Sequence, residues 1–328
     1  MSPRARILVI VGAATALAAG GTVALAVITA NDKGGGERRA TPLEGAPPLV
    51  LDLGVRVDPE ARALRKAEGL LKKRPAAAGK IFARYESPGA RIGAAIAAWP
   101  DDSLDAVERL AREHPEDSLV QLHLGYAKRW VGDVAGAAEA WRKAATVQPD
   151  SPSAQRADDA LHPGFPAGEP LFVPSFEPPA AIDRLSPPQQ FAFLRRRASR
   201  PDARAKLLYG LALQRLGHRI SARRQYDAAV KLDPRDPEAQ VAAAVARFDK
   251  SRPAAAFSRL GPLTRRFPHA ATVRFHLGVL LLWLARAQPG SCAEAKRQLR
   301  QARAEEPDSS LSREARRLLR SLEGVRGC

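Results

Sequence analysis

Prolines that follow helical stretches recur along this chain at a fixed interval. Pro115 and Pro149 are separated by 34 residues, and so are Pro234 and Pro268. Proline stops an α-helix because its ring removes a backbone donor and clashes with the preceding turn. A period of this length is typical of solenoids, in which each helical hairpin buries its apolar face only against a neighbour. The interval therefore predicts an all-α chain.

Two segments, 118–151 and 203–236, align residue by residue on these prolines. A small residue in the first helix lets the second helix approach closely, an aromatic residue fills the space behind it, and a glycine between the helices supplies a positive φ. The positions that agree are Leu124-Gly125, Gly132, Ala137, Trp141, Ala144 and Pro149 in the first segment, and Tyr209-Gly210, Gly217, Ala222, Tyr226, Ala229 and Pro234 in the second.

This pattern resembles the tetratricopeptide repeat (TPR), whose consensus places a large residue, Leu-Gly, Gly, Ala, an aromatic residue, Ala and Pro at these offsets. The resemblance implies a superhelix of helical hairpins. Looser copies follow at 237–270 and at 271–309, the latter with a short insertion between its helices. Residues 310–328 are expected to form a capping helix and tail, and residues 49–117 degenerate helical repeats.

The 51 residues between the two strong copies, 152–202, are 17 longer than one repeat. That length predicts a single TPR-like repeat with a Pro-rich insertion at 162–183, and it argues against a domain boundary there. The insertion carries apolar residues that need a surface to cover. We expect it to lie along the solenoid and to occupy part of the groove as an internal ligand. Its apolar residues are Phe165, Leu171, Phe172, Val173 and Phe176.

Residues 7–30, after a six-residue tail at 1–6, form an uncharged apolar stretch. Its 24 residues are long enough to cross a bilayer as a transmembrane helix. The alternative is a cleaved signal peptide, for which Ala24-Leu25-Ala26 would be the cleavage site. Residues 31–48, rich in glycine, proline and charge, predict a flexible linker.

The sequence contains no enzyme motif. It has no glycine-rich phosphate loop, no His-Glu-x-x-His, no Cys-x-x-Cys and no Gly-x-Ser-x-Gly. His123 and His276 fall at equivalent positions of two first helices, which indicates a structural role. We therefore expect no catalytic residue, no metal site and no cofactor.

The TPR resemblance implies a concave groove that binds a protein or peptide through the first helices. Aromatic residues and arginine are the types enriched at binding hot spots. The alternative is that the apolar candidates, Leu282 and Trp283 above all, only pack between helices. Carried onto this sequence, the candidate groove residues are Tyr126, Arg129, Trp130, Arg204, Gln214, Arg215, Phe248, Phe275, Leu282 and Trp283.

Basic residues exceed acidic ones by 17 in the whole chain, with 52 Lys and Arg against 35 Asp and Glu. Residues 195–235 hold 12 basic and 3 acidic residues. This excess predicts a patch that binds anionic lipid or polymer, unless it is only a solvated face. Nucleic acid is not expected, because the interleaved aromatics of single-strand binders are missing. The patch comprises Arg195, Arg196, Arg197, Arg219, Arg223 and Arg224.

The chain has two cysteines, Cys292 and Cys328. Cys292 is expected in the longer loop of the last repeat, to which the capping helix returns, so the two are candidates for a disulfide; the alternative is two thiols. A disulfide persists only in an oxidising compartment, which would place the body outside the cytoplasm.

These features together predict a single-pass bacterial cell-membrane protein whose helical body is a non-catalytic scaffold. The TPR resemblance extends to membrane-tethered proteins of envelope protein assembly or cytochrome maturation. The rival is a structural or adhering protein that acts through its arginine patch.

Overall fold

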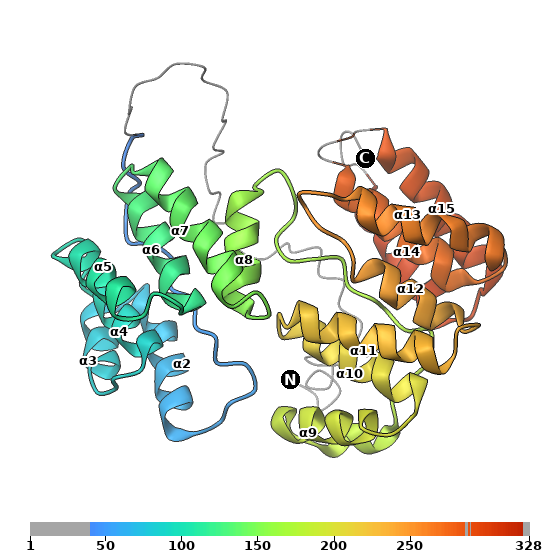
Figure 1. Ribbon diagram of the computed structural model, residues 1–328, viewed down its shortest axis with the longest axis horizontal. Coiled ribbons are helices and arrows are strands. Elements are labelled where there is room, and N and C mark those ends of the chain that lie inside the picture. The colour runs from blue at the N-terminus through green and yellow to red at the C-terminus, as the bar shows by residue number, and fades with distance from the viewer. Residues whose placement is uncertain (1–39, 286–287, 289, 324–328) are drawn as a thin grey trace. The chain divides into compact units, whose positions relative to one another are not determined.

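The computed structural model describes residues 40–285, 288 and 290–323, and this part of the chain is helical without any strand (Figure 1). It divides after residue 161 into two units. The N-terminal unit contains α2 (Pro59–Leu71), α3 (Pro75–Phe82), α4 (Pro88–Ala97), α5 (Ser103–Glu113), α6 (Ser118–Trp130), α7 (Val134–Val147) and α8 (Pro152–Leu161). The C-terminal unit contains the short 3-10 helix η1 (Ala180–Arg184), α9 (Pro187–Ala198), α10 (Ala203–Arg215), α11 (Arg219–Leu232), α12 (Pro237–Val245), α13 (Ala254–Arg266), α14 (Ala271–Leu284), α15 (Ser291–Glu305) and α16 (Ser310–Ser321).

The 34-residue period is confirmed by the helix bounds. Helices α6 and α8 begin 34 residues apart, and so do α10, α12 and α14 in succession. Helices α5, α7, α11 and α13 each end two residues before one of the recurring prolines, as α7 does before Pro149 and α11 before Pro234. The recurring proline therefore marks where these four hairpins stop.

Close packing inside the hairpins follows the expected pattern. A Cβ added to Gly125 would overlap the indole of Trp141, and one added to Gly210 would overlap the ring of Tyr226. Both aromatic side chains are fully buried. Gly132 and Gly217 end the first helices with φ of +87° and +83°, a conformation that glycine adopts without steric cost.

Helices contact their neighbours in sequence and also the next helix but one. In the N-terminal unit, α2, α4, α6 and α8 form such a series, and in the C-terminal unit α10, α12, α14 and α16 do. The first helices of the hairpins thus form one layer in each unit. The expected all-α repeat fold is confirmed, and α16 stands where the capping helix was expected.

Two expectations about the segments between repeats need correction. Residues 152–202 do not form one repeat, because α8 packs on α6 and α7 in the N-terminal unit whereas α9 packs on α10 in the C-terminal unit. The second half of the expected linker is also ordered, since Ala40 N–H donates to the Gly132 carbonyl at 3.0 Å and Pro47 is buried.

The expected transmembrane helix at 7–30 lies outside the described residues. Among the residues that are described, none of the helices is long and apolar enough to span a bilayer.

Candidate functional site

The stretch between α8 and η1 crosses the first-helix layer of the C-terminal unit without forming helix or strand. Its backbone N–H groups donate to side chains of three different first helices. Phe172 donates to Gln214 Oε1 on α10 at 3.3 Å, and Val173 to His276 Nε2 on α14 at 2.9 Å. Ser175 donates to both carboxylate oxygens of Glu238 on α12 at 3.3 Å. The insertion therefore lies along the first-helix layer, as expected. That it occupies the site of a partner stays a prediction.

Aromatic contacts accompany these hydrogen bonds. Phe172, fully buried, stacks on the His276 ring at a centroid distance of 5.3 Å and meets Tyr226 edge-on at 5.7 Å. Phe176 lies under the Arg204 guanidinium, 5.2 Å from it. The insertion therefore supplies core side chains as well as backbone donors, and it belongs to the hydrophobic core of this unit.

The geometry of His276 fixes its protonation. The amide of Val173 can only donate, so Nε2 must accept, and Nδ1 lies 2.7 Å from the carbonyl oxygen of Thr272, to which it donates. Burial lowers the pKa of His276 to about 4. The imidazole is therefore neutral at physiological pH and acts as an acceptor for the segment.

Burial shifts the pKa of Glu238 upward, whereas it shifts the pKa of His276 downward. Burial raises the pKa of its carboxyl to about 7, although the amide and hydroxyl of Ser175 favour the ionised form. A carboxyl that is partly neutral near pH 7 can lie among the apolar residues of the first-helix layer at a smaller desolvation cost.

The N-terminal unit holds an extended segment of its own in the same manner. Val50 N–H donates to His123 Nε2 at 3.1 Å, and His123 Nδ1 lies 2.8 Å from the Leu119 carbonyl oxygen. Leu43 N–H donates to the Trp130 carbonyl at 2.9 Å. Burial lowers the pKa of His123 to about 4, as it does in the other unit.

Asp52 completes this second contact. One carboxylate oxygen accepts from the backbone N–H of Ser153 at 3.0 Å and from its hydroxyl at 2.6 Å, which ties the segment to α8. Residues 40–53 therefore lie on the helices of the N-terminal unit as the insertion does in the other unit, a contact that the sequence reasoning missed. The signal was the pair of equivalent histidines together with a shared pattern, Pro47-Pro48-Leu49-Val50 and Pro170-Leu171-Phe172-Val173.

The candidate groove residues separate into two groups. Three of them contact the insertion: Gln214, which also donates from Nε2 to the Pro170 carbonyl, Arg204 over Phe176, and Phe248, whose ring meets Phe165 at 6.2 Å. The other C-terminal candidates are partly or fully buried, and Phe275, Leu282 and Trp283 belong to the hydrophobic core, which supports the packing alternative for them. Those residues are Arg215, Phe275, Leu282 and Trp283.

In the N-terminal unit the three candidates are also buried. Tyr126 lies edge-on to Trp141 at 5.9 Å, and burial raises its pKa to about 12. Arg129 is 7% exposed. Trp130 lines a cleft of about 440 Å³ beside the extended segment. Of these three, only Trp130 lines the cleft.

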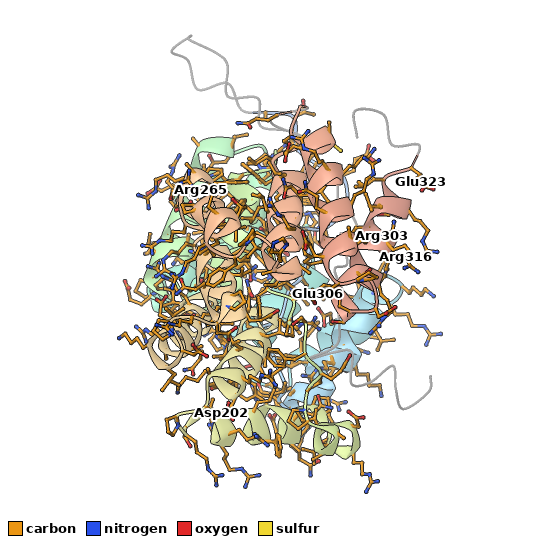
Figure 2. All side chains as sticks on the ribbon, turned by 90° about the vertical axis from the view of Figure 1, so that its right-hand side faces the viewer. Asp202, Arg265, Arg303, Glu306, Arg316 and Glu323 are labelled. Carbon is orange, nitrogen blue, oxygen red and sulfur yellow. The ribbon has the colours of Figure 1, made fainter. Side chains whose placement is uncertain are left out.

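The expected arginine patch is divided between two helices. Arg195, Arg196 and Arg197 are exposed on the last turn of α9, whereas Arg219, Arg223 and Arg224 lie on α11. Several are paired with acids, as Arg219 is with Glu169 at 3.2 Å. Exposed arginine is not confined to residues 195–235, because Figure 2 shows Arg265, Arg303 and Arg316 at the surface of other helices.

The remaining expectations concern the two cysteines and the absence of a metal site. Cys292 is the second residue of α15 and is buried, so it lies in the helix and not in the loop before it, while Cys328 lies outside the described residues. Lys296 Nζ donates to the Leu322 carbonyl at 3.5 Å, which brings the end of α16 beside the first turns of α15. Within the described ranges no three His, Cys, Asp or Glu side chains gather as metal ligands would.

No family model and no curated protein matches this sequence. Solved structures that resemble it are TPR proteins with low scores. Yeast Tom70 is 12% identical with a TM-score of 0.30, and the match covers 80% of this chain but only 53% of Tom70. A TPR protein from Parabacteroides merdae is 12% identical, with 80% and 97% covered and a TM-score of 0.32. The TPR2AB domain of yeast Sti1, in a complex with pHSP90, is 14% identical, with 80% and 98% covered and a TM-score of 0.29. Similarities of this size assign no partner to this chain.

Proposed function

We propose that this chain is a non-catalytic scaffold that binds an extended segment of a partner protein on its first-helix layers. The observation that carries the proposal is that both layers already hold extended polypeptide through side chains that accept from backbone N–H groups. Contacts to the backbone depend little on the sequence of the bound segment, so another extended segment can use them. The insertion then competes with the partner for the C-terminal layer.

The test loosens the insertion and offers it back as a separate peptide. Phe172→Ala removes the aromatic anchor but leaves Gln214, His276 and Glu238 in place. A labelled peptide with the sequence of residues 162–179 is expected to bind this variant at least about tenfold more tightly than the unaltered chain, by fluorescence anisotropy.

The matched control is Phe193→Ala, which removes a partly buried phenylalanine of α9 outside the insertion. It should bind no better than the unaltered chain, and a scrambled peptide should bind neither. If Phe172→Ala retains its helical circular dichroism and still fails to bind the peptide, the layer does not accept extended polypeptide from outside. Phe165→Ala, a milder change at the edge of the insertion, gives the same comparison should Phe172→Ala unfold.

The tether and its side of the membrane form a second part of the proposal. The uncharged stretch at 7–30 would hold the body at the cell membrane of a bacterium, with the helical units outside the cytoplasm and a role in envelope protein assembly. Fractionation tests it: the full chain should resist alkaline carbonate extraction, and a chain lacking residues 1–31 should be soluble and helical. If expression of the full chain yields soluble protein whose N-terminus lies after the stretch, the stretch is a cleaved signal peptide.

The exposed arginines of α9 favour one alternative function, adhesion to anionic lipid or polymer. Arg195, Arg196 and Arg197 lie together on one turn. Binding by such a patch weakens steeply with salt, whereas capture of a peptide by aromatic and backbone contacts does not. Sedimentation with phosphatidylglycerol vesicles at low and high salt separates the two.

A further inference from the structure

The two units differ at the place where the segment enters the first-helix layer. In the C-terminal unit this place is filled by the chain itself. Phe165 packs edge-on against Phe248 at 6.2 Å, and Phe248 packs against Trp283 at 5.6 Å. Lys250 lies over the same indole with Nζ 6.0 Å from its centroid. An aromatic side chain of the insertion thus closes the space between the α12–α13 turn and the end of α14.

The segments of the two units can be placed in register by the amides that meet the histidines. Phe165 stands eight residues before Val173, and the residue eight before Val50 is Pro42. The tryptophans also correspond, because Trp283 follows His276 by seven residues and Trp130 follows His123 by seven. The N-terminal unit therefore has a small ring where the other unit has phenylalanine.

The consequence of this difference is an open cleft. A space of about 440 Å³ lies between Trp99 and Pro100 of the α4–α5 turn, Trp130 and Val131 at the end of α6, and Pro42 and Leu43 of the segment. This volume lies in the range of small-ligand pockets, and its walls are largely apolar and aromatic. Pairs of aromatic rings stabilise one another beyond the area that they bury.

Residues 1–39 and 324–328 contain no phenylalanine, tyrosine or tryptophan. Three exposed acids are sequence neighbours of the lining residues: Glu44 stands between Leu43 and Gly45, and Asp101 and Asp102 directly follow Pro100. These carboxylates complement a positively charged ligand.

We propose that the cleft between Trp99 and Trp130 binds an aromatic side chain of a partner protein, flanked in the partner by basic residues. This inference deepens the proposed scaffold function and rests on it, because it names the chemistry of the bound segment. The partner's ring takes the place that Phe165 takes in the other unit, and its basic neighbours face Glu44, Asp101 and Asp102.

The experiment uses the full chain and a photoreactive peptide, Lys-Pro-Bpa-Pro-Lys, in which Bpa is benzoylphenylalanine. Cross-links mapped by mass spectrometry are expected on Trp99, Trp130 or their neighbours in the cleft. The peptide Lys-Pro-Phe-Pro-Lys should compete, whereas Lys-Pro-Ala-Pro-Lys and Glu-Pro-Phe-Pro-Glu should compete at least about tenfold less well.

The decisive variant is Pro42→Phe, which gives the N-terminal unit the aromatic residue of the C-terminal unit. It should close the cleft, abolish cross-linking and leave the helical fold intact, because Pro42 is exposed. Thr41→Phe, an exposed neighbour, is the matched control and should cross-link like the unaltered chain.

Equal cross-linking of the Pro42→Phe variant and the unaltered chain would overturn the proposal, as would equal competition by the alanine peptide. The scaffold function is judged separately, since its peptide binds the C-terminal layer of the Phe172→Ala variant, where this cleft takes no part. Either experiment can therefore fail without the other.

Discussion

Each of the two units packs an extended segment of the chain on its first helices through the same hydrogen bond, but the two segments bury different amounts of apolar surface. In both, a neutral histidine on a first helix accepts from the amide of a valine in an extended segment. In the C-terminal unit the residue before that valine is Phe172, fully buried, whereas in the N-terminal unit it is Leu49, which is only partly buried. The shared hydrogen bond sets the register of the segment, and the apolar side chains set how firmly it is held.

The acidic contacts are reversed between the units. Glu238 lies on a helix and accepts from the segment, whereas Asp52 lies on the segment and accepts from Ser153 of a helix. Backbone N–H groups that are buried need acceptors, and side chains supply these acceptors in both units.

The largest expected effect distinguishes the two segments by burial. Phe172→Ala should lower the free energy of unfolding of the C-terminal unit by about 3–5 kcal/mol, since it removes a fully buried ring. Leu49→Ala should cost the N-terminal unit less than about 2 kcal/mol, because less apolar surface is lost. Hydrogen exchange read by mass spectrometry reports on each unit separately. Equal losses of unfolding free energy in the two variants would contradict the claim that the insertion is bound more firmly than the N-terminal segment.

The next prediction concerns the cysteines, which only the C-terminal unit contains. If Cys292 and Cys328 are bonded, reduction should destabilise that unit by about 2–4 kcal/mol and leave the N-terminal unit unchanged. Alkylation before reduction, followed by mass spectrometry, counts the free thiols. Two freely alkylated thiols in native material would remove both the disulfide and the argument that it makes for an oxidising compartment.

Acid should weaken the units through their histidines. The folded-state pKa of His123 and of His276, about 4, lies below the ordinary value of 6.5, so the unfolded chain binds more protons between these values. The stability that each contributes is present above pH 6.5 and is lost as the pH falls to about 4, at most about 3 kcal/mol per histidine. Urea unfolding as a function of pH measures this loss.

Glu238 opposes the effect of His276 on the stability of the C-terminal unit. Its raised pKa, about 7, means that its contribution is present below the ordinary value of 4.5 and is lost as the pH rises through 7. The two groups oppose one another in that unit, and in the N-terminal unit Asp52, whose pKa burial also raises, opposes His123 in the same way. The acid loss of each unit should therefore be smaller than its histidine alone would give. His123→Gln, which keeps an acceptor that does not titrate, should flatten the N-terminal profile, and an unchanged profile would exclude His123 as the cause.

The smallest effect separates the acidic contacts. Asp52→Asn should destabilise the N-terminal unit by about 1–2 kcal/mol, because a charged acceptor of two hydrogen bonds is lost. Glu238→Gln should change stability near neutral pH by less than about 1 kcal/mol, since the carboxyl there is already partly neutral. A larger loss of unfolding free energy for Glu238→Gln than for Asp52→Asn would show that Glu238, and not Asp52, makes the stronger contact.

Much of the fold could be predicted because the signals are local. In the two strong copies, proline follows the second helix and a glycine with positive φ ends the first, and Gly125 and Gly210 admit Trp141 and Tyr226 within one hairpin. The docking of the insertion was also predictable, because Phe172 and Val173 in a stretch that cannot form a helix must find an apolar surface.

The N-terminal segment could not be predicted in this way. Its glycines and prolines are typical of a linker, and its hold comes from partners far away in sequence: Val50 meets His123 over 73 residues and Asp52 meets Ser153 over 101. Several groove candidates are buried in the core for a related reason. First-helix residues also serve the contacts between neighbouring hairpins, and Phe275 is buried by that packing.

Amide hydrogen exchange at Val50 and Val173, measured by NMR, tests the central claim that each unit closes on an extended segment of its own chain. Both amides should exchange far more slowly than those of an unstructured peptide, and Val173 more slowly than Val50 because Phe172 covers its hydrogen bond. Exchange at the rate of an unstructured chain at either position would show that the histidine does not hold the segment there.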